Sequence, residues 1–133
     1  MTILLEPPNT KVGHAGTWLD TTPKAAQLID AVGSRNLGIL FDVYHAQIEG
    51  EDFAAMIAAH GDKIRYFHLA DMPGRNAPGD AEIDWTVLSQ AMATMQAPTP
   101  VGLEYVPTTA TVDSLRQTTA FLKNTGIAPV VGG

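Results

Sequence analysis

Four short runs of apolar residues recur along the chain, separated by longer segments whose apolar residues fall at helical spacing. The runs cover residues 2–5, 37–41, 64–69 and 100–103. Apolar residues follow one another in these runs with little polar alternation, which is typical of strands buried on both faces, as in parallel sheets. We therefore predict four β-strands.

Start and stop signals delimit four helices between and after these strands. Thr22 is predicted as the N-cap of the first helix because a proline follows it, and Gly33 ends that helix. In the fourth helix, Val112, Leu115 and Phe121 are predicted to face inward. The other limits are residues 50–52 and Gly61 for the second helix, Asp84 for the start of the third, and residues 111–124 with Gly126 for the fourth.

Alternation of strands and helices predicts a parallel α/β fold. A closed TIM (β/α)8 barrel needs about 250 residues, and this chain has 133. The predicted fold class is therefore a parallel (βα)4 half of such a barrel, over residues 1–126, with a C-terminal tail over 127–133. The half barrel is a fragment of a longer barrel, or two copies close a barrel as a homodimer, or the strands form an open sheet with two exposed edges.

Each predicted strand leads to a side chain that can bind a metal. Because the C-terminal ends of barrel strands share one rim, these side chains form a candidate site for a divalent cation. A set of oxygen and nitrogen ligands without sulfur favours Mg2+ or Mn2+, with Co2+ and Zn2+ as competitors. Any one of them alone could equally be a cap or a surface residue, so the shared position carries the prediction. The residues are Glu6, Asp42, His68 and Glu104.

Such a site suits proton transfer next to a carbonyl group. A bound cation would polarise a carbonyl and stabilise an enediolate. Carboxylates on either side of the reacting carbon could act as general base and general acid. This chemistry is that of an isomerase or an epimerase.

Composition and charge exclude several other functions. The formal net charge is -6, which disfavours nucleic acid and anionic membrane surfaces as partners. The chain has no cysteine, so disulfides and thiolate metal sites are excluded. No run approaches the roughly 18 apolar residues of a membrane span, and the N-terminus has no signal-peptide pattern. We predict a cytoplasmic protein.

The motifs LLEPPN, DVYHAQI, HLADMPGR with the later EIDW, and GLEY resemble the second half of the hydroxypyruvate isomerases. That group belongs to the xylose isomerase-like barrels, which include the tagatose and psicose 3-epimerases. The resemblance runs from about Ile3 to Phe121. It implies a metal-dependent isomerase of carbohydrate metabolism that interconverts an aldehyde and a ketone on a small hydroxy-acid or sugar substrate.

The same resemblance implies roles for individual residues. Glu6 and Glu104 would be the acid/base pair, and His45 would contact a substrate oxygen. Arg75 would do the same or hold a substrate carboxylate, to which a guanidinium is suited by its paired donors. The implied metal ligands are Glu6, Asp42, His68 and Glu104.

Two positions depart from the hydroxypyruvate isomerase or the epimerase pattern and keep alternatives open. Hydroxypyruvate isomerases often carry Gln at the position of His68, whereas ketose epimerases carry His there. Val12 stands where those epimerases place a second acid, six residues after the first ligand. The alternatives are a ketose 3-epimerase and a non-catalytic, truncated half barrel that binds a metal or a partner. An abasic-site endonuclease on the same barrel is disfavoured by the acidic charge and the lack of a basic patch.

Overall fold

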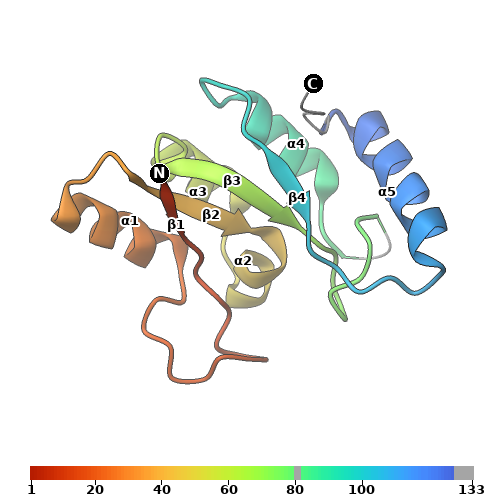
Figure 1. Ribbon diagram of the computed structural model, residues 1–133, viewed down its shortest axis with the longest axis horizontal. Coiled ribbons are helices and arrows are strands. Elements are labelled where there is room, and N and C mark those ends of the chain that lie inside the picture. The colour runs from red at the N-terminus through yellow and green to blue at the C-terminus, as the bar shows by residue number, and fades with distance from the viewer. Residues whose placement is uncertain (80–81, 128–133) are drawn as a thin grey trace.

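The computed structural model describes residues 1–79 and 82–127 (Figure 1). The strands are β1 (Ile3–Leu5), β2 (Leu37–Asp42), β3 (Ile64–Leu69) and β4 (Val101–Leu103). The helices are α1 (Thr22–Val32), α2 (Val43–Glu49), α3 (Phe53–His60), α4 (Trp85–Ala93) and α5 (Thr111–Thr125).

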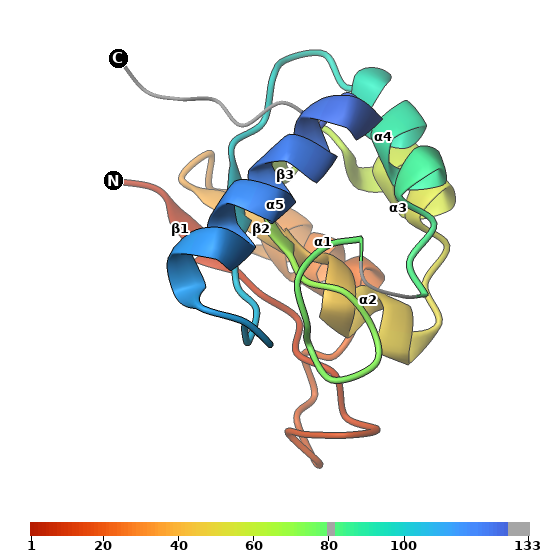
Figure 2. The same cartoon turned by 90° about the vertical axis from the view of Figure 1, so that its right-hand side faces the viewer.

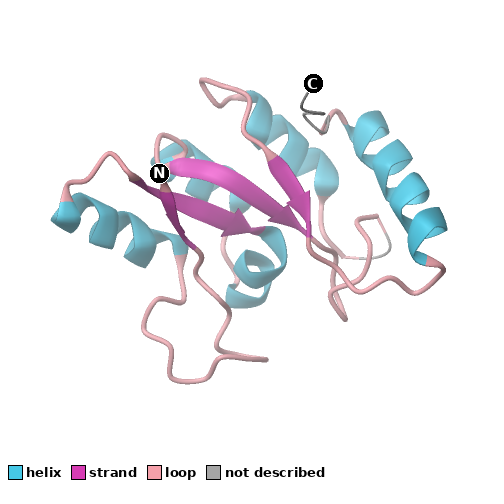
Figure 3. Ribbon diagram, viewed as in Figure 1, coloured by secondary structure: helices cyan, strands magenta, loops and turns pink. Residues whose placement is uncertain are grey.

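The strands form one sheet in the order β1-β2-β3-β4, and every neighbouring pair is parallel. All four strands therefore end on the same side of the sheet, where the loops that follow them gather (Figure 3). This arrangement confirms the predicted parallel (βα)4 half barrel.

One face of the sheet is covered by α1, α3 and α4, as the edge-on view shows (Figure 2). Side chains alternate between faces along a strand, so Phe41 and Phe67 point into this helix-covered layer, where they are 1% and 0% exposed. Burying a side chain of this size contributes about 1.5–3 kcal/mol. Asp42 and His68 follow them by one position and are register partners. They therefore point to the opposite face, which would be the inside of a barrel.

Helix α2 was missed by the sequence interpretation, which began its second helix only at residues 50–52. Asp42 is the N-cap of α2, because its side chain accepts a hydrogen bond from the backbone N–H of His45 at 3.0 Å. The helix thus begins directly at the residue that was predicted to end the second strand. The side chain of Asp42 is therefore both a predicted metal ligand and a helix cap.

The N-cap predicted for α1 is wrong by one residue. Thr22 is the first helical residue, and Thr21 at the cap position makes no side-chain capping bond. The carboxylate of Glu51 takes that role instead, accepting from the Thr22 backbone N–H and hydroxyl at 2.7 Å each. Local sequence cannot reveal this contact because Glu51 lies far along the chain.

The inward face predicted for α5 is also wrong in part. Val112 and Leu115 are 58% and 42% exposed, while Phe121 packs against the core as predicted. The buried stripe is formed instead by Ser114, Thr118 and Leu122. The hydroxyl of Tyr105 hydrogen-bonds to Ser114 at 2.8 Å and accepts from Thr118 at 3.4 Å, so polar contacts turn that stripe inward.

The predicted tail over residues 127–133 lies outside the described residues from 128 onward, and Ile127 is buried in the core. Among the described residues no helix has the length and apolar character needed to cross a membrane. The cytoplasmic location stays a prediction.

Candidate active site and metal centre

Four strand ends bring Glu6, Asp42, His68 and Glu104 into one cluster. Asp42 and His68 lie in β2 and β3, and the two glutamates directly follow the edge strands β1 and β4. One ligand atom from each residue can be chosen so that all four lie within 4.8 Å of one another. The structure therefore brings together the residues that the strand pattern had singled out.

The distances in this cluster suit a single divalent cation. His68 Nδ1 lies 2.6 Å from Glu104 Oε2, 3.4 Å from Glu6 Oε1 and 3.8 Å from Asp42 Oδ2. Ligand atoms placed about 2.1 Å from Mg2+ in octahedral geometry are separated by about 3–4 Å. Two of the three distances match this range, and the His68–Glu104 pair at 2.6 Å would have to separate slightly. The Asp42 side chain is 1% exposed and that of Glu104 is 48% exposed. The donor set and its spacing fit a hard or borderline cation that is open to solvent on the Glu104 side.

Arg75 reaches the same cluster from the loop between β3 and α4. Its Nη2 lies 3.0 Å from Asp42 Oδ2 and 2.9 Å from Glu104 Oε2, and its Nε donates to the Glu104 carbonyl. The guanidinium lies 5.2 Å from the centroid of the Tyr44 ring. Its donors thus point at two carboxylates, so Arg75 lies where it could contact an anionic group of a substrate bound beside them.

Asp71 organises the loop that carries Arg75. Its carboxylate is fully buried and accepts hydrogen bonds from the backbone N–H groups of Gly79, Glu82 and Ile83 and from the indole N–H of Trp85. The backbone of Arg75 adopts φ 57, which L-residues visit rarely. Such a backbone needs firm support, which the contacts of Asp71 provide. The sequence interpretation assigned a substrate contact to Arg75 in this loop but did not identify Asp71.

His45 borders the cluster from α2. Its backbone N–H bonds Asp42 as described, and its ring Nδ1 contacts Asn9 in the loop after β1. Burial lowers the pKa of the imidazole below its ordinary value. Burial thus favours the neutral form of the ring next to the predicted ligands. Its partner Asn9 was also missed by the sequence interpretation.

The pKa of Glu6 is shifted by its surroundings in the cluster. Burial, and then the negative charge of Asp42, raise the pKa of Glu6 above its ordinary value. The hydrogen bond from His68 opposes that rise. A carboxyl group that keeps its proton to a higher pH is better suited to exchanging one near neutrality.

A parallel half barrel with a carboxylate and imidazole cluster at its strand ends defines a class of α/β barrels with a candidate metal site. The sequence matches the xylose isomerase-like TIM barrel family over residues 1–125, and the chain belongs to that family.

Three relatives illustrate the similarity. Hydroxypyruvate isomerase of Escherichia coli (strain K12) is 38% identical over 115 residues, which are 86% of this chain and 44% of that protein. D-psicose 3-epimerase of Enterocloster bolteae is 30% identical over 79 residues, 59% of this chain and 26% of that protein. The crystal structure of an AP endonuclease of family 2 from Brucella melitensis superposes with a TM-score of 0.82 at 27% identity, covering 93% of this chain and 46% of that one. The chain spans less than half the length of these relatives.

Proposed function

We propose that this chain carries the catalytic half of a metal-dependent isomerase that interconverts an aldehyde and a ketone by proton transfer, most similar to hydroxypyruvate isomerase. The observation that supports this proposal is the placement of two carboxylates on either side of one imidazole. Glu6 and Glu104 follow the opposite edge strands, and both have an oxygen within 3.4 Å of His68 Nδ1. A substrate carbon held between Glu6 and Glu104 would have a base on one side and an acid on the other.

The chain's own residues supply the proton transfer and the orientation of the substrate. Glu6 or Glu104 removes the proton next to the carbonyl, and the other carboxyl, or the same one, returns it to the neighbouring carbon of the enediolate. Arg75 orients the substrate through an oxygen or a carboxylate, and His45 contacts a second oxygen. A divalent cation held by the four-residue cluster, Mg2+ or Mn2+ in preference to Co2+ or Zn2+, would supply Lewis-acid polarisation of the carbonyl when bound.

Exchange of substrate hydrogen with solvent tests this scheme. The protein is incubated with hydroxypyruvate and Mn2+ or Mg2+ in D2O, and product and recovered substrate are analysed for deuterium by mass spectrometry. Deuterium in both is expected, and Glu104→Gln and Glu6→Gln should lower the exchange rate by about 100-fold or more. Asp113→Asn is the matched control, because that carboxylate lies on α5 and pairs with Arg116 away from the cluster. Product formation without deuterium would contradict the proposal.

A ketose 3-epimerase is the alternative supported by a particular residue. Ketose epimerases, by the resemblance, carry a histidine at the position of His68, and the similarity to a D-psicose 3-epimerase agrees with this residue. Against this alternative, Val12 is 74% exposed where a second acid would be needed. Incubation with D-fructose and detection of its 3-epimer separates the two activities.

A non-catalytic half barrel is the second alternative, because the chain spans only 44% of the E. coli isomerase. In the described part of the chain β1 and β4 are edge strands, and Ile3 and Leu103 on them are 52% and 36% exposed. Pairing of two such edges with a second copy would complete eight strands. Light scattering distinguishes a homodimer from a monomer, and a monomer that binds Mn2+ but exchanges no substrate hydrogen would favour the non-catalytic alternative.

Cleavage of DNA has little support in this chain, although one structural relative is named an endonuclease. The formal net charge of -6 opposes binding of a phosphate backbone. The described residues contain one candidate metal cluster, and three of its four members are carboxylates. A small hydroxy acid or sugar is therefore the proposed substrate.

A further inference from the structure

The ring of His45 is held by two donors that come from a single residue. Asn9 directs its backbone N–H to His45 Nδ1 at 3.1 Å, and its side-chain Nδ2 lies 2.7 Å from the same atom. Both residues are buried, with 2% of Asn9 and 4% of His45 exposed. Nδ1 of this ring is therefore bonded within the protein and not to water.

The orientation of the Asn9 amide follows from two further donors. Its Oδ1 lies 3.0 Å from the backbone nitrogens of both Val12 and Gly13, and a backbone N–H can only donate. The amide oxygen must therefore face these two residues, and the NH2 group must face His45. Nδ1 of His45 then accepts from the amide and from the Asn9 backbone, so it carries no proton. In the neutral ring the proton is on Nε2.

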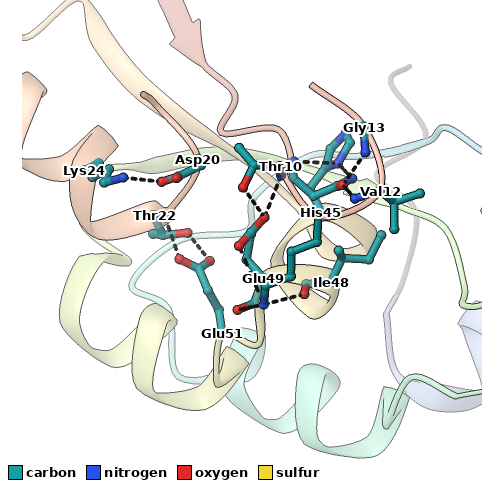
Figure 4. A network of polar contacts seen from close by, with 12 residues as sticks. Thr10, Val12, Gly13, Asp20, Thr22, Lys24, His45, Ile48, Glu49 and Glu51 are labelled. Atoms are coloured by element: carbon teal, nitrogen blue, oxygen red, sulfur yellow. Dashed lines mark hydrogen bonds and ion pairs between the residues drawn. The ribbon is translucent and has the colours of Figure 1, made fainter. Parts of the chain in front are cut away.

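The segment that carries Asn9 is anchored independently of its side chain. The Thr10 backbone N–H and hydroxyl both donate to Glu49 Oε1, at 2.6 and 3.1 Å (Figure 4). Lys11 Nζ donates to the carbonyls of Ile48 and Glu49 at the end of α2. Because these contacts tie the segment to the same helix that carries His45, a change limited to the Asn9 side chain should leave the segment in place.

Nε2 is the ring nitrogen of His45 that remains available to a ligand. It makes no hydrogen bond to a described residue, and no buried side-chain nitrogen or oxygen in residues 1–79 and 82–127 lacks a partner. Nε2 must therefore be reachable from outside the core. The His45 backbone is bonded to Asp42 in the cluster, and the charges of Asp42, Arg75 and Glu104 act on the His45 imidazole, so the ring lies beside the proposed site.

We propose that Asn9 is a positioning residue that holds His45 in the form protonated on Nε2, so that His45 donates a hydrogen bond to a substrate oxygen and does not accept a proton there. This inference deepens the proposed function and rests on it for the identity of the ligand. It leaves proton transfer to Glu6 and Glu104. It also identifies the substrate atom that His45 recognises as an acceptor, a carbonyl or developing oxyanion.

Long-range proton–nitrogen NMR of the 15N-labelled protein at mildly alkaline pH reads the two ring nitrogens directly. The wild-type protein should show His45 Nδ1 without a proton and Nε2 with one. In Asn9→Asp one oxygen can still accept from Val12 and Gly13, while the other replaces the donor that faces the ring. His45 should then gain a proton on Nδ1. Thr10→Val is the matched control, since it removes a hydroxyl of the same segment without facing the ring, and it should keep the wild-type pattern.

A proton on Nδ1 in the wild-type protein would overturn the assignment. An unchanged pattern in Asn9→Asp would overturn the positioning role of the Asn9 side chain. Addition of hydroxypyruvate should shift the Nε2–H signal of the wild-type protein, and no shift would overturn the donor role. In turnover, Asn9→Asp should lower kcat by about 10- to 100-fold with a smaller change in KM, as for loss of a donor to a developing oxyanion. Because the NMR pattern needs no turnover, an inactive chain with the expected pattern would refute the proposed function and leave the assignment of the His45 proton standing.

Discussion

The buried carboxylate of Asp71 supports the loop that carries Arg75, and Asp71→Asn tests that support with almost no change in size. Oδ1 of Asp71 accepts from the backbone N–H groups of Met72, Glu82 and Ile83, at 2.8–3.1 Å. Oδ2 accepts from the Gly79 N–H and the Trp85 indole N–H, both at 3.0 Å. An amide can keep its oxygen on the first side, but it then turns an NH2 group toward the two donors on the second side.

The expected loss of stability follows from those two bonds. A hydrogen bond to a charged acceptor contributes about 1.5–3 kcal/mol. Losing two of them gives about 3–6 kcal/mol, and movement of the loop should reduce this to about 3–4 kcal/mol of unfolding free energy. Trp85→Phe removes the indole donor while leaving the carboxylate, and should cost about 1–3 kcal/mol including the change in packing.

Urea unfolding followed by far-UV circular dichroism measures these free energies. Limited trypsin digestion gives a local measure, because a loosened loop exposes the bond after Arg75 and should be cut faster in Asp71→Asn than in the wild-type protein. A loss below about 1 kcal/mol, or an unchanged rate of cleavage after Arg75, would refute the role given to Asp71.

Two further predictions concern Glu51 and a glycine in the loop before α4. Burial raises the pKa of the Glu51 carboxyl, so the folded state binds the carboxyl proton more tightly than the unfolded state does. The stability of the wild-type protein relative to Glu51→Gln should therefore fall as the pH rises from about 4.5, near the pKa of an unfolded chain, through the raised pKa. Urea unfolding across this pH range measures the difference, and a stability advantage of the wild type that grows with pH would contradict the prediction. Gly79 has φ 100, and a Cβ there would lie 2.9 Å from the Phe121 ring, so Gly79→Ala should destabilise by about 1–3 kcal/mol in thermal unfolding. Gly13→Ala is its control, since a Cβ there would meet nothing within 4 Å, and equal losses in both would be the wrong outcome.

The sheet could be predicted from the sequence because each strand is a continuous apolar run with clear ends. Predicted and observed limits are the same for β3, and they differ by a residue for the other strands. The four candidate ligands could be found for the same reason, since parallel strands must end on one side. This part of the site is encoded by position along the chain alone.

The contacts that position the site could not be predicted because they join residues far apart in sequence. Asn9 meets His45, and Glu51 caps a helix that begins at Thr22. Helix α2 was missed because its cap, Asp42, had been assigned to the preceding strand end. A prediction from sequence patterns gives each residue a single role, whereas the Asp42 carboxylate is at once a strand end, a helix cap and a candidate ligand.

The inward face of α5 failed for a different reason. Its apolar residues Val112 and Leu115 suggested a core-facing stripe. The buried face is instead the one that carries Ser114 and Thr118, which hydrogen-bond to the Tyr105 hydroxyl. The apolar pattern of this helix therefore did not decide which face is buried, because the hydrogen-bonding partner lies outside the helix.

Calorimetric titration with Mn2+ tests most directly whether the four strand ends form one metal site. The wild-type chain should bind one Mn2+, and Asp42→Ala, His68→Ala and Glu104→Ala should each weaken that binding by about tenfold or more. Asp113→Asn should bind as the wild-type protein does. Unchanged affinity in all three cluster variants would contradict a shared metal site, and with it the proposed isomerase.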